Sequence, residues 1–518
     1  MLYNVLLVLY FVGCVFGLWF VFKKAGVAPW KSLIPIYNIV VWIKVCGKSW
    51  RWYIYFLIPA INIFTFLLLV VETAKTFHRY GFWEQTAAVI LPWVYLPVLG
   101  LSKLQYVDPT SEPPHKVGAV RDWLDAIVFA LVAAVIIRGK VFELYHIPSS
   151  SMEGSLLVGD RLMVSKLSYG PRVMMTPLSL PLVHNVLPLT NGQVESYLKW
   201  IELPYHRFPG FGSVERYDAV VFNYPDGDTM CSAQFSNRSY HDLVRQYGLD
   251  AVENDRVYDD FGNRIEIGKI RVRPIDKREN FIKRCIGLPG ETIQLREQQV
   301  FINGKPIRDP EGLQFTYAVN FKPGMANPAQ VLDGMGVSQE DMQNAFMEQR
   351  YLGTSYLLLP LRRDVAESLR QRYDVAAIEP VIFPAGDSSR DLFPHDTLHR
   401  WSIDNYGPVH IPAAGETLAL TPQNISIYAR LISVYENNTL SVSNGKIYIN
   451  GQETTQYKVK QNYYWMMGDN RHNSADSRYW GFVPEDHIMG KAKTVLWSFD
   501  KDHKCVRWNR FMRSASAL

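Results

Sequence analysis

Residues 2–22, LYNVLLVLYFVGCVFGLWFVF, form an uncharged apolar run at the start of the chain. A helix of this length crosses about 30 Å of hydrocarbon. A cleaved signal peptide would carry basic residues before its apolar core, whereas Lys23 and Lys24 follow this one. We therefore expect residues 2–22 to be a helical membrane anchor.

Three more apolar runs follow, at residues 52–71, 86–101 and 123–137. The run 86–101 is short and contains two prolines, so it is either a crossing or a re-entrant segment, and the second choice would reverse the topology. Four crossings are the preferred interpretation. Basic residues are concentrated in the first and third loops, which favours a cytoplasmic side for both. Everything after Lys140 is then expected outside.

These runs predict a domain organisation. Residues 1–106 are expected to form a three-helix membrane unit, 107–121 a linker, 122–140 the fourth transmembrane helix, and 141–518 an extracytoplasmic domain. The composition is that of an ordinary globular protein, and the net charge of +5 suggests no nucleic-acid partner.

The external region is expected to be mainly β. Short runs such as YDAVVFNYP alternate apolar and polar residues and end in turn residues. Residues 290–307 and 438–454 each read as a strand, a turn and a strand. A helical stretch near 325–375 predicts an inserted β/α region, and insertions are placed at about 226–278 and 309–460. The apolar stretch 176–211 is either core or a membrane-facing surface.

Most catalytic chemistries are excluded by missing motifs. The chain has no HExxH, CxxC, EF-hand, Walker or GxSxG pattern, and GDNRHN lacks the companion blocks of a metal site. We expect neither metal nor cofactor. Serine chemistry remains, and it needs a base beside the hydroxyl. The candidate bases are His146, His472, His487 and, if burial lowers its pKa, Lys283 in NFIKRCIGLPG. Taken alone, a lysine in a strand is more often a solvated residue.

Four ordered segments carry a more specific signal. They are IPSSSMEGSLLVGDRLMVSK, ERYDAVVFNYP, NFIKRCIGLPGE and MMGDNRHNSADSRYWGFVPEDHIMGKA. In this order they resemble the boxes of type I signal peptidases, membrane-bound Ser/Lys endopeptidases that remove signal peptides from exported proteins. The resemblance covers the fourth apolar run, the boxes and the strands between them, and leaves out the first three apolar runs.

The resemblance implies a role for individual residues. Ser151, immediately before Met152, matches the nucleophile, and Lys283 matches the general base. The Ser149 hydroxyl and the Ser151 N–H match the oxyanion donors. Ser474 matches a serine that orients the lysine. Supporting positions are matched by Asp476, Arg478, Gly468 and Asn470, and we interpret the Asp476–Arg478 pair as structural.

A few positions depart from the family pattern. Gly154 and Ser155 stand where the family commonly has Pro-Thr. Glycine and serine can form the same turn as Pro-Thr, so we expect a change in local rigidity but no loss of activity. His472 stands where an acidic residue is frequent, with no expected catalytic consequence. Ser150, where glycine is common, is interpreted as a spacer.

The implied function is cleavage of signal peptides after an A-x-A-like site. Expected partners are signal-peptide-bearing preproteins, the lipid bilayer and the protein export machinery. The expected location is the bacterial inner membrane, with the catalytic domain on the periplasmic side. Two alternatives stay open: a degenerate peptidase-like membrane scaffold, and a self-processing Ser/Lys protease, a class that is soluble and carries a DNA-binding module.

Overall fold

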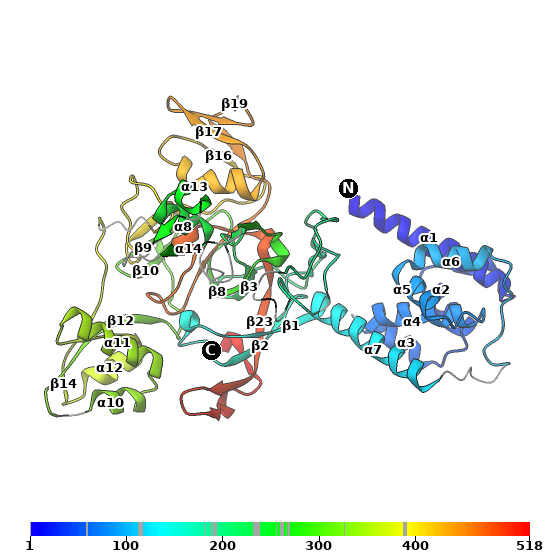
Figure 1. Cartoon of the computed structure of the whole chain (residues 1–518), viewed down its shortest axis with the longest axis horizontal. Coiled ribbons are helices and arrows are strands. Elements are labelled where there is room, and N and C mark those ends of the chain that lie inside the picture. The colour runs from blue at the N-terminus through cyan, green and yellow to red at the C-terminus, as the bar shows by residue number, and fades with distance from the viewer. Residues whose placement is uncertain are drawn as a thin grey trace. The chain divides into compact units, whose positions relative to one another are not determined.

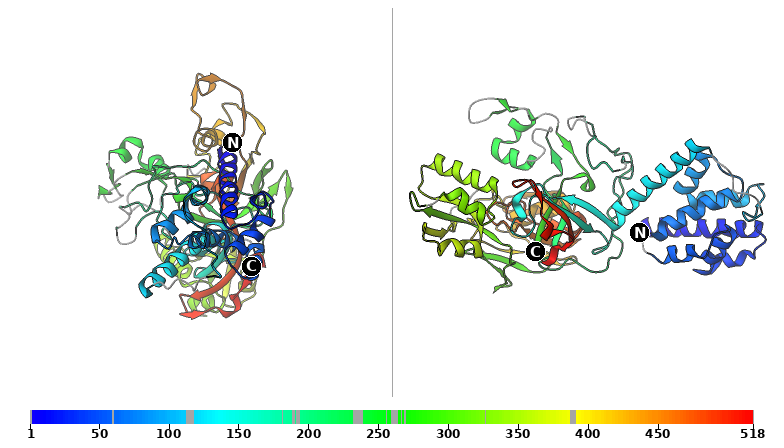
Figure 2. Two further views of the ribbon diagram at one scale, coloured as in Figure 1. Left: turned by 90° about the vertical axis from the view of Figure 1, so that its right-hand side faces the viewer. Right: turned by 90° about the horizontal axis from the view of Figure 1, so that it is seen from below.

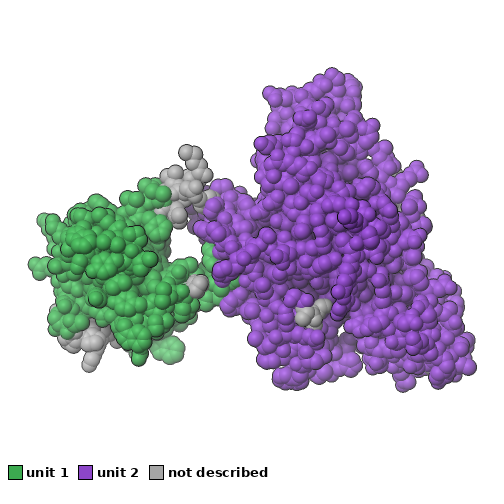
Figure 3. All heavy atoms as spheres, turned by 180° about the vertical axis from the view of Figure 1, so that it is seen from behind, with its two compact units in different colours: residues 1–141 green, residues 142–518 purple. Residues whose placement is uncertain are grey.

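The computed structural model describes residues 2–58, 61–111, 118–180, 182–187, 190, 194–231, 239–254, 256–258, 264–265, 267, 270–325, 327–386 and 391–517. The chain divides into two compact units, residues 1–141 and 142–518, which Figure 3 shows in two colours. Each unit has its own hydrophobic core, so each is described by itself.

Unit 1 is helical in the part of the chain that the structure describes. Its α-helices are α1 (Leu2–Lys24), α2 (Tyr37–Val45), α3 (Arg51–Leu57), α4 (Ile61–Lys75), α5 (Phe82–Ile90), α6 (Pro92–Leu101) and α7 (Ala119–Ile136). The apolar run 86–101 becomes two helices because Pro92, which has no N–H to donate, occupies the first turn of α6. Residues 59–60, within the run 52–71, and 112–117, within the expected linker, lie outside the described residues.

Glycines allow α1 and α6 to pack closely. A Cβ at Gly17 would lie 2.5 Å from Leu96 Cβ, and one at Gly13 would lie 2.6 Å from the Trp93 carbonyl oxygen. Gly13 and Gly17 are one helical turn apart, so they present one small-residue stripe to α6. Trp42 of α2 donates from Nε1 to Thr73 Oγ1 at 2.6 Å and so ties α2 to α4.

None of the helices in the described ranges combines the length and the apolar character that a bilayer crossing requires. The four crossings expected from the sequence are therefore not confirmed and stay predictions.

Unit 2 is built around a nine-stranded antiparallel sheet, which confirms the mainly β catalytic domain (Figure 1). Its spatial order is β1-β2-β23-β3-β8-β21-β22, and β24 and β25 pair with β23. The strands are β1 (Phe142–His146), β2 (Asp160–Ser165), β3 (Ala219–Asn223), β8 (Asn280–Gly287), β21 (Tyr463–Met467), β22 (Val483–Pro484), β23 (Ile488–Asp500), β24 (Cys505–Val506) and β25 (Arg513–Ser514). Strands far apart in sequence thus become neighbours, and β3 and β8 are central.

Both expected strand–turn–strand segments are confirmed. The first forms β9 (Thr292–Arg296), β10 (Gln299–Ile302) and β11 (Lys305–Pro306), and the second forms β17 (Leu440–Ser443), β18 (Lys446–Ile449) and β19 (Gln452–Glu453). Asn303 and Gly304, like Asn444 and Gly445, have positive φ. This conformation at both turn residues suits the twist of a two-residue hairpin and favours Asn-Gly.

The expected helical insertion is a small α/β module with its own core, here called the inserted module (residues 313–386). Its sheet has the order β13-β12-β14, made by β12 (Gln314–Phe321), β13 (Leu357–Arg362) and β14 (Val375–Pro380). Its helices are α10 (Pro328–Gly334), α11 (Gln339–Leu352) and α12 (Arg363–Arg370). Figure 2 shows this yellow-green segment as a distinct lobe of unit 2.

The rest of the stretch 309–460 joins the main core. β15 (Tyr406–His410) pairs with β9 and completes a four-stranded sheet, and α13 (Ile425–Arg430) contributes to the same core. The other short elements of unit 2 are β4 (Thr229–Met230), α8 (Tyr240–Tyr247), α9 (Leu249–Glu253), β5 (Val257–Tyr258), β6 (Arg264–Ile265), β7 (Arg271–Val272), β16 (Thr417–Ala419), β20 (Gln456–Lys458) and α14 (Ser477–Trp480).

The glycine contact between α1 and α6 predicts the effect of one added methyl group. Gly17→Ala should destabilise unit 1 by about 1–3 kcal/mol, because the helices must separate to admit the Cβ. Thermal unfolding of the full chain measures this. Gly139→Ala is the control, since nothing lies within 4 Å of its Cβ position. Equal melting temperatures for the two variants would refute the close packing.

Candidate active site

The loop after β1 places three serines at the edge of the sheet. Ser150–Met152 form a single 3-10 turn, and Met152 is buried in the core beneath it. We call residues 149–157 the catalytic turn. Gly154 has a φ of +93°, and a Cβ there would lie 2.0 Å from the Gly312 carbonyl oxygen. Glycine therefore meets both the backbone conformation and the close approach that this position requires.

Lys283 lies on the central strand β8, opposite Val220 of β3. Alternation along the strand points Lys283 to one face and Arg284 to the other, as expected from the sequence. The Lys283 side chain is 2% exposed, and its Nζ lies 2.7 Å from Ser151 Oγ and 3.0 Å from the Ile282 carbonyl oxygen. The structure therefore brings together two residues that are 132 positions apart in the sequence.

Burial changes the acidity of this lysine. It lowers the pKa of Lys283 to about 8, although the charges of Asp476 and Asp469 act in the opposite direction. About a tenth of the amine is then neutral at pH 7, far more than in an exposed lysine. A neutral amine accepts a hydrogen bond from the serine hydroxyl, which is the arrangement that a general base needs.

Both nearby carboxylates are held by arginines. Asp476 accepts from Arg478 Nε at 2.9 Å and Nη2 at 2.7 Å, and Asp469 accepts from Arg284 Nε at 2.8 Å and Nη2 at 2.6 Å. Burial alone would raise the pKa of Asp476, but the charge and hydrogen bonds of Arg478 outweigh it and lower the pKa. Each acid thus pairs with its own arginine, which limits the charge left to hold Lys283 protonated.

The loop between β21 and α14 supports the catalytic turn. The Gly468 N–H donates to Asp476 at 3.1 Å, and the Asn470 N–H donates to the Ser151 carbonyl oxygen at 3.2 Å. Asn470 Nδ2 also donates to the Ser150 carbonyl oxygen at 3.3 Å. A Cβ at Gly468 would lie 2.5 Å from the Ser151 carbonyl oxygen and 2.1 Å from Ser474 Oγ. Gly468 is therefore the point of closest contact between the loop and the turn.

The three serines and Ser474 differ in their surroundings. Ser149 is exposed in the cleft and its hydroxyl makes no capping hydrogen bond. Ser150 Oγ accepts from Asn473 Nδ2 at 3.0 Å, so it faces the supporting loop. Ser474 Oγ reaches the Ala475 carbonyl oxygen at 3.5 Å, and among the described residues no hydrogen bond joins it to Lys283. Its role as an orienting group stays a prediction.

A cleft of about 600 Å³ contains Ser151 and Lys283. Its walls are formed largely by apolar side chains of β1, β2, β3 and β8, and of the residue that directly follows β1. These side chains are Tyr145, Ile147, Leu162, Val221, Phe281 and Ile282. His146 also lies at the cleft, whereas His487 is buried between Asp486 and Arg278, and His472 bonds to Asp404. Of the four candidate bases, Lys283 is the one that the structure places within hydrogen-bond distance of Ser151 Oγ.

Sequence reasoning missed the Arg284–Asp469 pair and the neighbours of the catalytic turn in the inserted module. One signal was available, because Arg284 directly follows Lys283 in an otherwise apolar strand and Asp469 directly follows Gly468. No metal-ligating cluster of His, Cys, Asp or Glu occurs within the described ranges.

Comparisons with known proteins identify the family of the chain. The family model described as signal peptidase, peptidase S26, matches residues 120–345 and 434–497. Residues 30–109 match a family of unknown function, DUF5684. The chain is a serine peptidase, a hydrolase. It belongs to the signal peptidase family, peptidase S26.

Similar proteins include three named signal peptidase I. That of Buchnera aphidicola subsp. Baizongia pistaciae is 52% identical over 367 residues, covering 71% of this chain and 73% of its own. That of Buchnera aphidicola subsp. Schizaphis graminum is 24% identical over 371 residues, covering 71% of each chain. That of Haemophilus influenzae is 21% identical over 477 residues, covering 89% of this chain and 93% of its own.

The contact at Gly468 predicts a loss of activity without loss of the fold. Gly468→Ala should lower peptidase activity about 10²-fold or more, because the added methyl displaces the Ser151 backbone from Lys283. Peptide cleavage and circular dichroism measure the two effects. Gly212→Ala, whose Cβ would meet only one atom at 3.8 Å, is the matched control. Full activity in Gly468→Ala would show that the position of Ser151 set by this loop does not matter for cleavage.

Proposed function

We propose that this protein removes N-terminal signal peptides from exported preproteins, with Ser151 as nucleophile and Lys283 as general base. The observation that carries the proposal is the 2.7 Å contact between Lys283 Nζ and Ser151 Oγ inside an apolar cleft. Membership of the signal peptidase family supports the reaction and the class of substrate.

The proposed reaction is acyl transfer in two stages. Neutral Lys283 takes the proton of the Ser151 hydroxyl as Oγ attacks the scissile carbonyl carbon. The resulting ammonium then gives its proton to the leaving amine, and an acyl-enzyme ester remains on Ser151. Lys283 next takes a proton from water, whose oxygen attacks the ester, and the proton returns to Ser151 as the signal peptide leaves.

We assign stabilisation of the oxyanion to the Ser149 hydroxyl and the Ser151 N–H. The free hydroxyl of Ser149 in the cleft supports this assignment. Such donors act where charge develops, and losing one typically costs about 10²–10³ in rate. Ser150 instead bonds to Asn473, which agrees with a spacer role.

The lining of the cleft supports a preference for small residues before the cut. Ile147, Leu162 and Val221 give it apolar walls that suit alanine-sized side chains of an A-x-A-like site. An extended substrate segment would lie beside β8, the strand that carries Lys283.

We further propose that the helices of unit 1 anchor the protein in the bacterial inner membrane, with unit 2 on the periplasmic side. Exposed apolar side chains on α7 support this, Trp123 being 73% exposed. So do exposed Trp200 and Phe211 in the stretch 176–211. Ser151 follows α7 closely in sequence, which suits a substrate whose apolar core is in lipid. The expected partners are the bilayer, preproteins and the export machinery.

The proposed domain boundaries are 1–106, 107–121, 122–140 and 141–518, with insertions at about 226–278 and 309–460. The division into compact units after residue 141 supports the last boundary.

Removing either member of the dyad should abolish cleavage. Ser151→Ala and Lys283→Ala are each expected to lose about 10³-fold or more in kcat on a model preprotein, because the first removes the nucleophile and the second removes the base. Ser149→Ala should lose less and Ser150→Ala little. The control is Lys322→Ala, an exposed lysine of the inserted module. Full activity in both dyad variants would overturn the assignment, and an inactive wild type would favour a scaffold.

The pKa of Lys283 predicts the acid side of the pH profile. Cleavage needs the neutral amine, so kcat/KM should rise as the pH increases toward about 8. Rates measured from pH 5.5 to 8 test this. An acid limb governed by a group with a pKa near 6 would point to a histidine base instead.

A further inference from the structure

The segment that leads into the inserted module contacts the catalytic turn through the backbone of Gly312. A Cβ at Gly154 would meet the Gly312 carbonyl oxygen, and a Cβ at Gly312 would lie 2.1 Å from Ser155 Oγ and 2.9 Å from the Gly154 backbone. Two glycines thus face each other with no side chain between them. Any shift of the segment that leads into β12 must therefore move the catalytic turn or break this contact.

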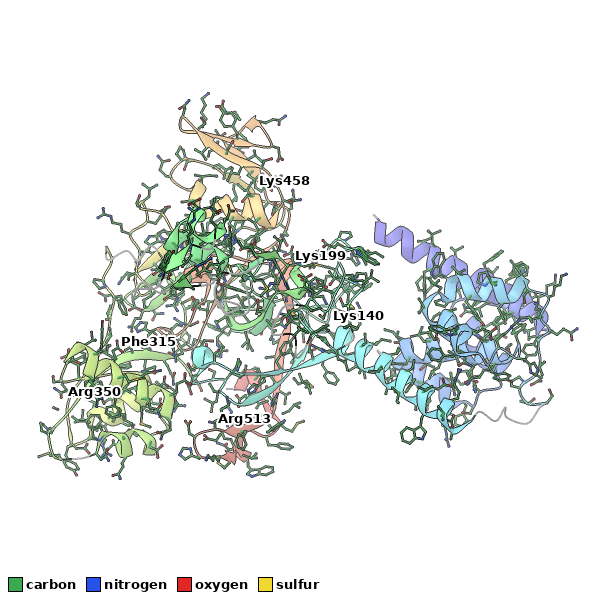
Figure 4. All side chains as sticks on the ribbon, in the orientation of Figure 1. Lys140, Lys199, Phe315, Arg350, Lys458 and Arg513 are labelled. Atoms are coloured by element: carbon green, nitrogen blue, oxygen red, sulfur yellow. The ribbon has the colours of Figure 1, made fainter. Side chains whose placement is uncertain are left out.

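The module also bonds to the supporting loop. The Gln314 N–H donates to the Asp469 carbonyl oxygen, and the Arg471 N–H donates to the Gln314 carbonyl oxygen, both at 2.9 Å. Between these bonds lies Asn470, whose N–H holds the Ser151 carbonyl oxygen. Phe315, labelled in Figure 4, packs beneath Arg471, with 5.9 Å between the ring centroid and the guanidinium carbon. The start of β12 is therefore bonded to the residues on either side of Asn470, the residue that holds the Ser151 carbonyl oxygen.

A cavity of about 230 Å³ lies between the module and the turn. Glu153, two residues after the nucleophile, lines it together with Gln314, Ser338 and Asp341. Glu153 Oε2 and Gln314 Oε1 are buried and accept no hydrogen bond from any described residue. An ionised Glu153 would be a poorly compensated buried charge at the junction of the module and the catalytic turn.

The charges around Glu153 are mostly negative. Asp341 and Glu340 face it from α11, and Asp502 faces it from the turn after β23, whereas Arg507 is the attractive charge. The two arginines that line the cavity are each paired with another acid. Arg510 is held by Asp160 at 2.7 Å, and Arg362 is held by Asp364 at 2.6 Å. Burial and the charges of Asp341 and Glu340 raise the pKa of Glu153 to about 8.

We propose that Glu153 is a positioning residue for signal-peptide cleavage: its protonated carboxyl keeps the inserted module seated on the catalytic turn, and its ionisation loosens that contact and moves Ser151 away from Lys283. The inference rests on the proposed function. It assigns the alkaline side of the pH profile to a group outside the dyad. Lys283 accounts for the acid side, because its amine must lose a proton, whereas Glu153 must keep one.

Glu153→Gln tests this, because glutamine keeps the shape of the neutral acid and does not ionise. At pH 9 about a tenth of a group with a pKa near 8 keeps its proton. Wild-type kcat/KM should therefore fall between pH 8 and 9.5, and Glu153→Gln should hold a plateau and exceed it about tenfold at pH 9. The control is Glu348→Gln, which removes an exposed acid of α11, the helix that carries Asp341. Its kcat/KM should show the same pH dependence as that of the wild type.

A second readout does not need cleavage. The folded protein keeps the Glu153 proton up to about pH 8 while the unfolded chain loses it near its ordinary pKa. The melting temperature of Glu153→Gln minus that of the wild type should therefore increase as the pH rises from 5 to 8. If the wild type cleaves and its kcat/KM falls above pH 8 in the same way as that of Glu153→Gln, the inference is wrong. If the melting difference appears but no variant cleaves, the proposed function fails instead.

A second variant covers the case in which Glu153→Gln does not fold. Asp341→Asn removes the nearest facing charge that raises the Glu153 pKa. The loss of activity between pH 8 and 9.5 should then become smaller, because the ionised Glu153 is repelled less. An alkaline limb that is unchanged in Asp341→Asn would contradict the proposal in the same way.

Discussion

The burial of Lys283 against Ser151 is the interaction on which the rest of the site depends. An exposed lysine is a poor base near neutral pH because it is almost wholly protonated. Here the amine lies on a central strand and is 2% exposed, and burial lowers its pKa to about 8. The nine-stranded sheet is the structural reason, since the pairing of β3 and β8 at its centre holds the lysine in the cleft.

A buried lysine can act as a base only if nearby acids do not raise its pKa by as much as burial lowers it. Asp469 and Asp476 are both close enough to raise its pKa. Each is instead bonded to an arginine, and each arginine pair also fixes a segment of backbone, one at β8 and one at α14. The same ion pairs that balance the charge therefore hold the loop that supports the catalytic turn. Removing one partner would disturb the pKa and the geometry together.

The sequence predicted local features well because they depend on neighbours along the chain. The hairpins with Asn-Gly turns and the helices of the inserted module form where turn chemistry and periodicity place them. The apolar run 86–101 forms two helices because Pro92 interrupts it. The resemblance to a family supplied the pairing of Ser151 with Lys283, and no local pattern reports a contact across 132 residues.

Contacts between distant segments were beyond sequence reasoning. The facing glycines Gly154 and Gly312, and the bond from Gln314 to the supporting loop, depend on how the inserted module sits on the sheet. No sequence pattern singled out Glu153, which the structure places with Asp341 in the lining of one cavity. For Ser474 the resemblance implied a contact that the structure does not contain. Ser474 lies against Gly468, and no hydrogen bond joins it to Lys283 among the described residues.

The most direct measurement of the central claim is the site and rate of covalent labelling by a penem-type acylating inhibitor, read by mass spectrometry of the full chain. The dyad predicts a single ester on Ser151 in the wild type, labelling that quickens as Lys283 becomes neutral, and no adduct in Lys283→Ala within the same time. A label on Ser149 or Ser150, or an equal rate in Lys283→Ala, would contradict the assignment of Ser151 and Lys283.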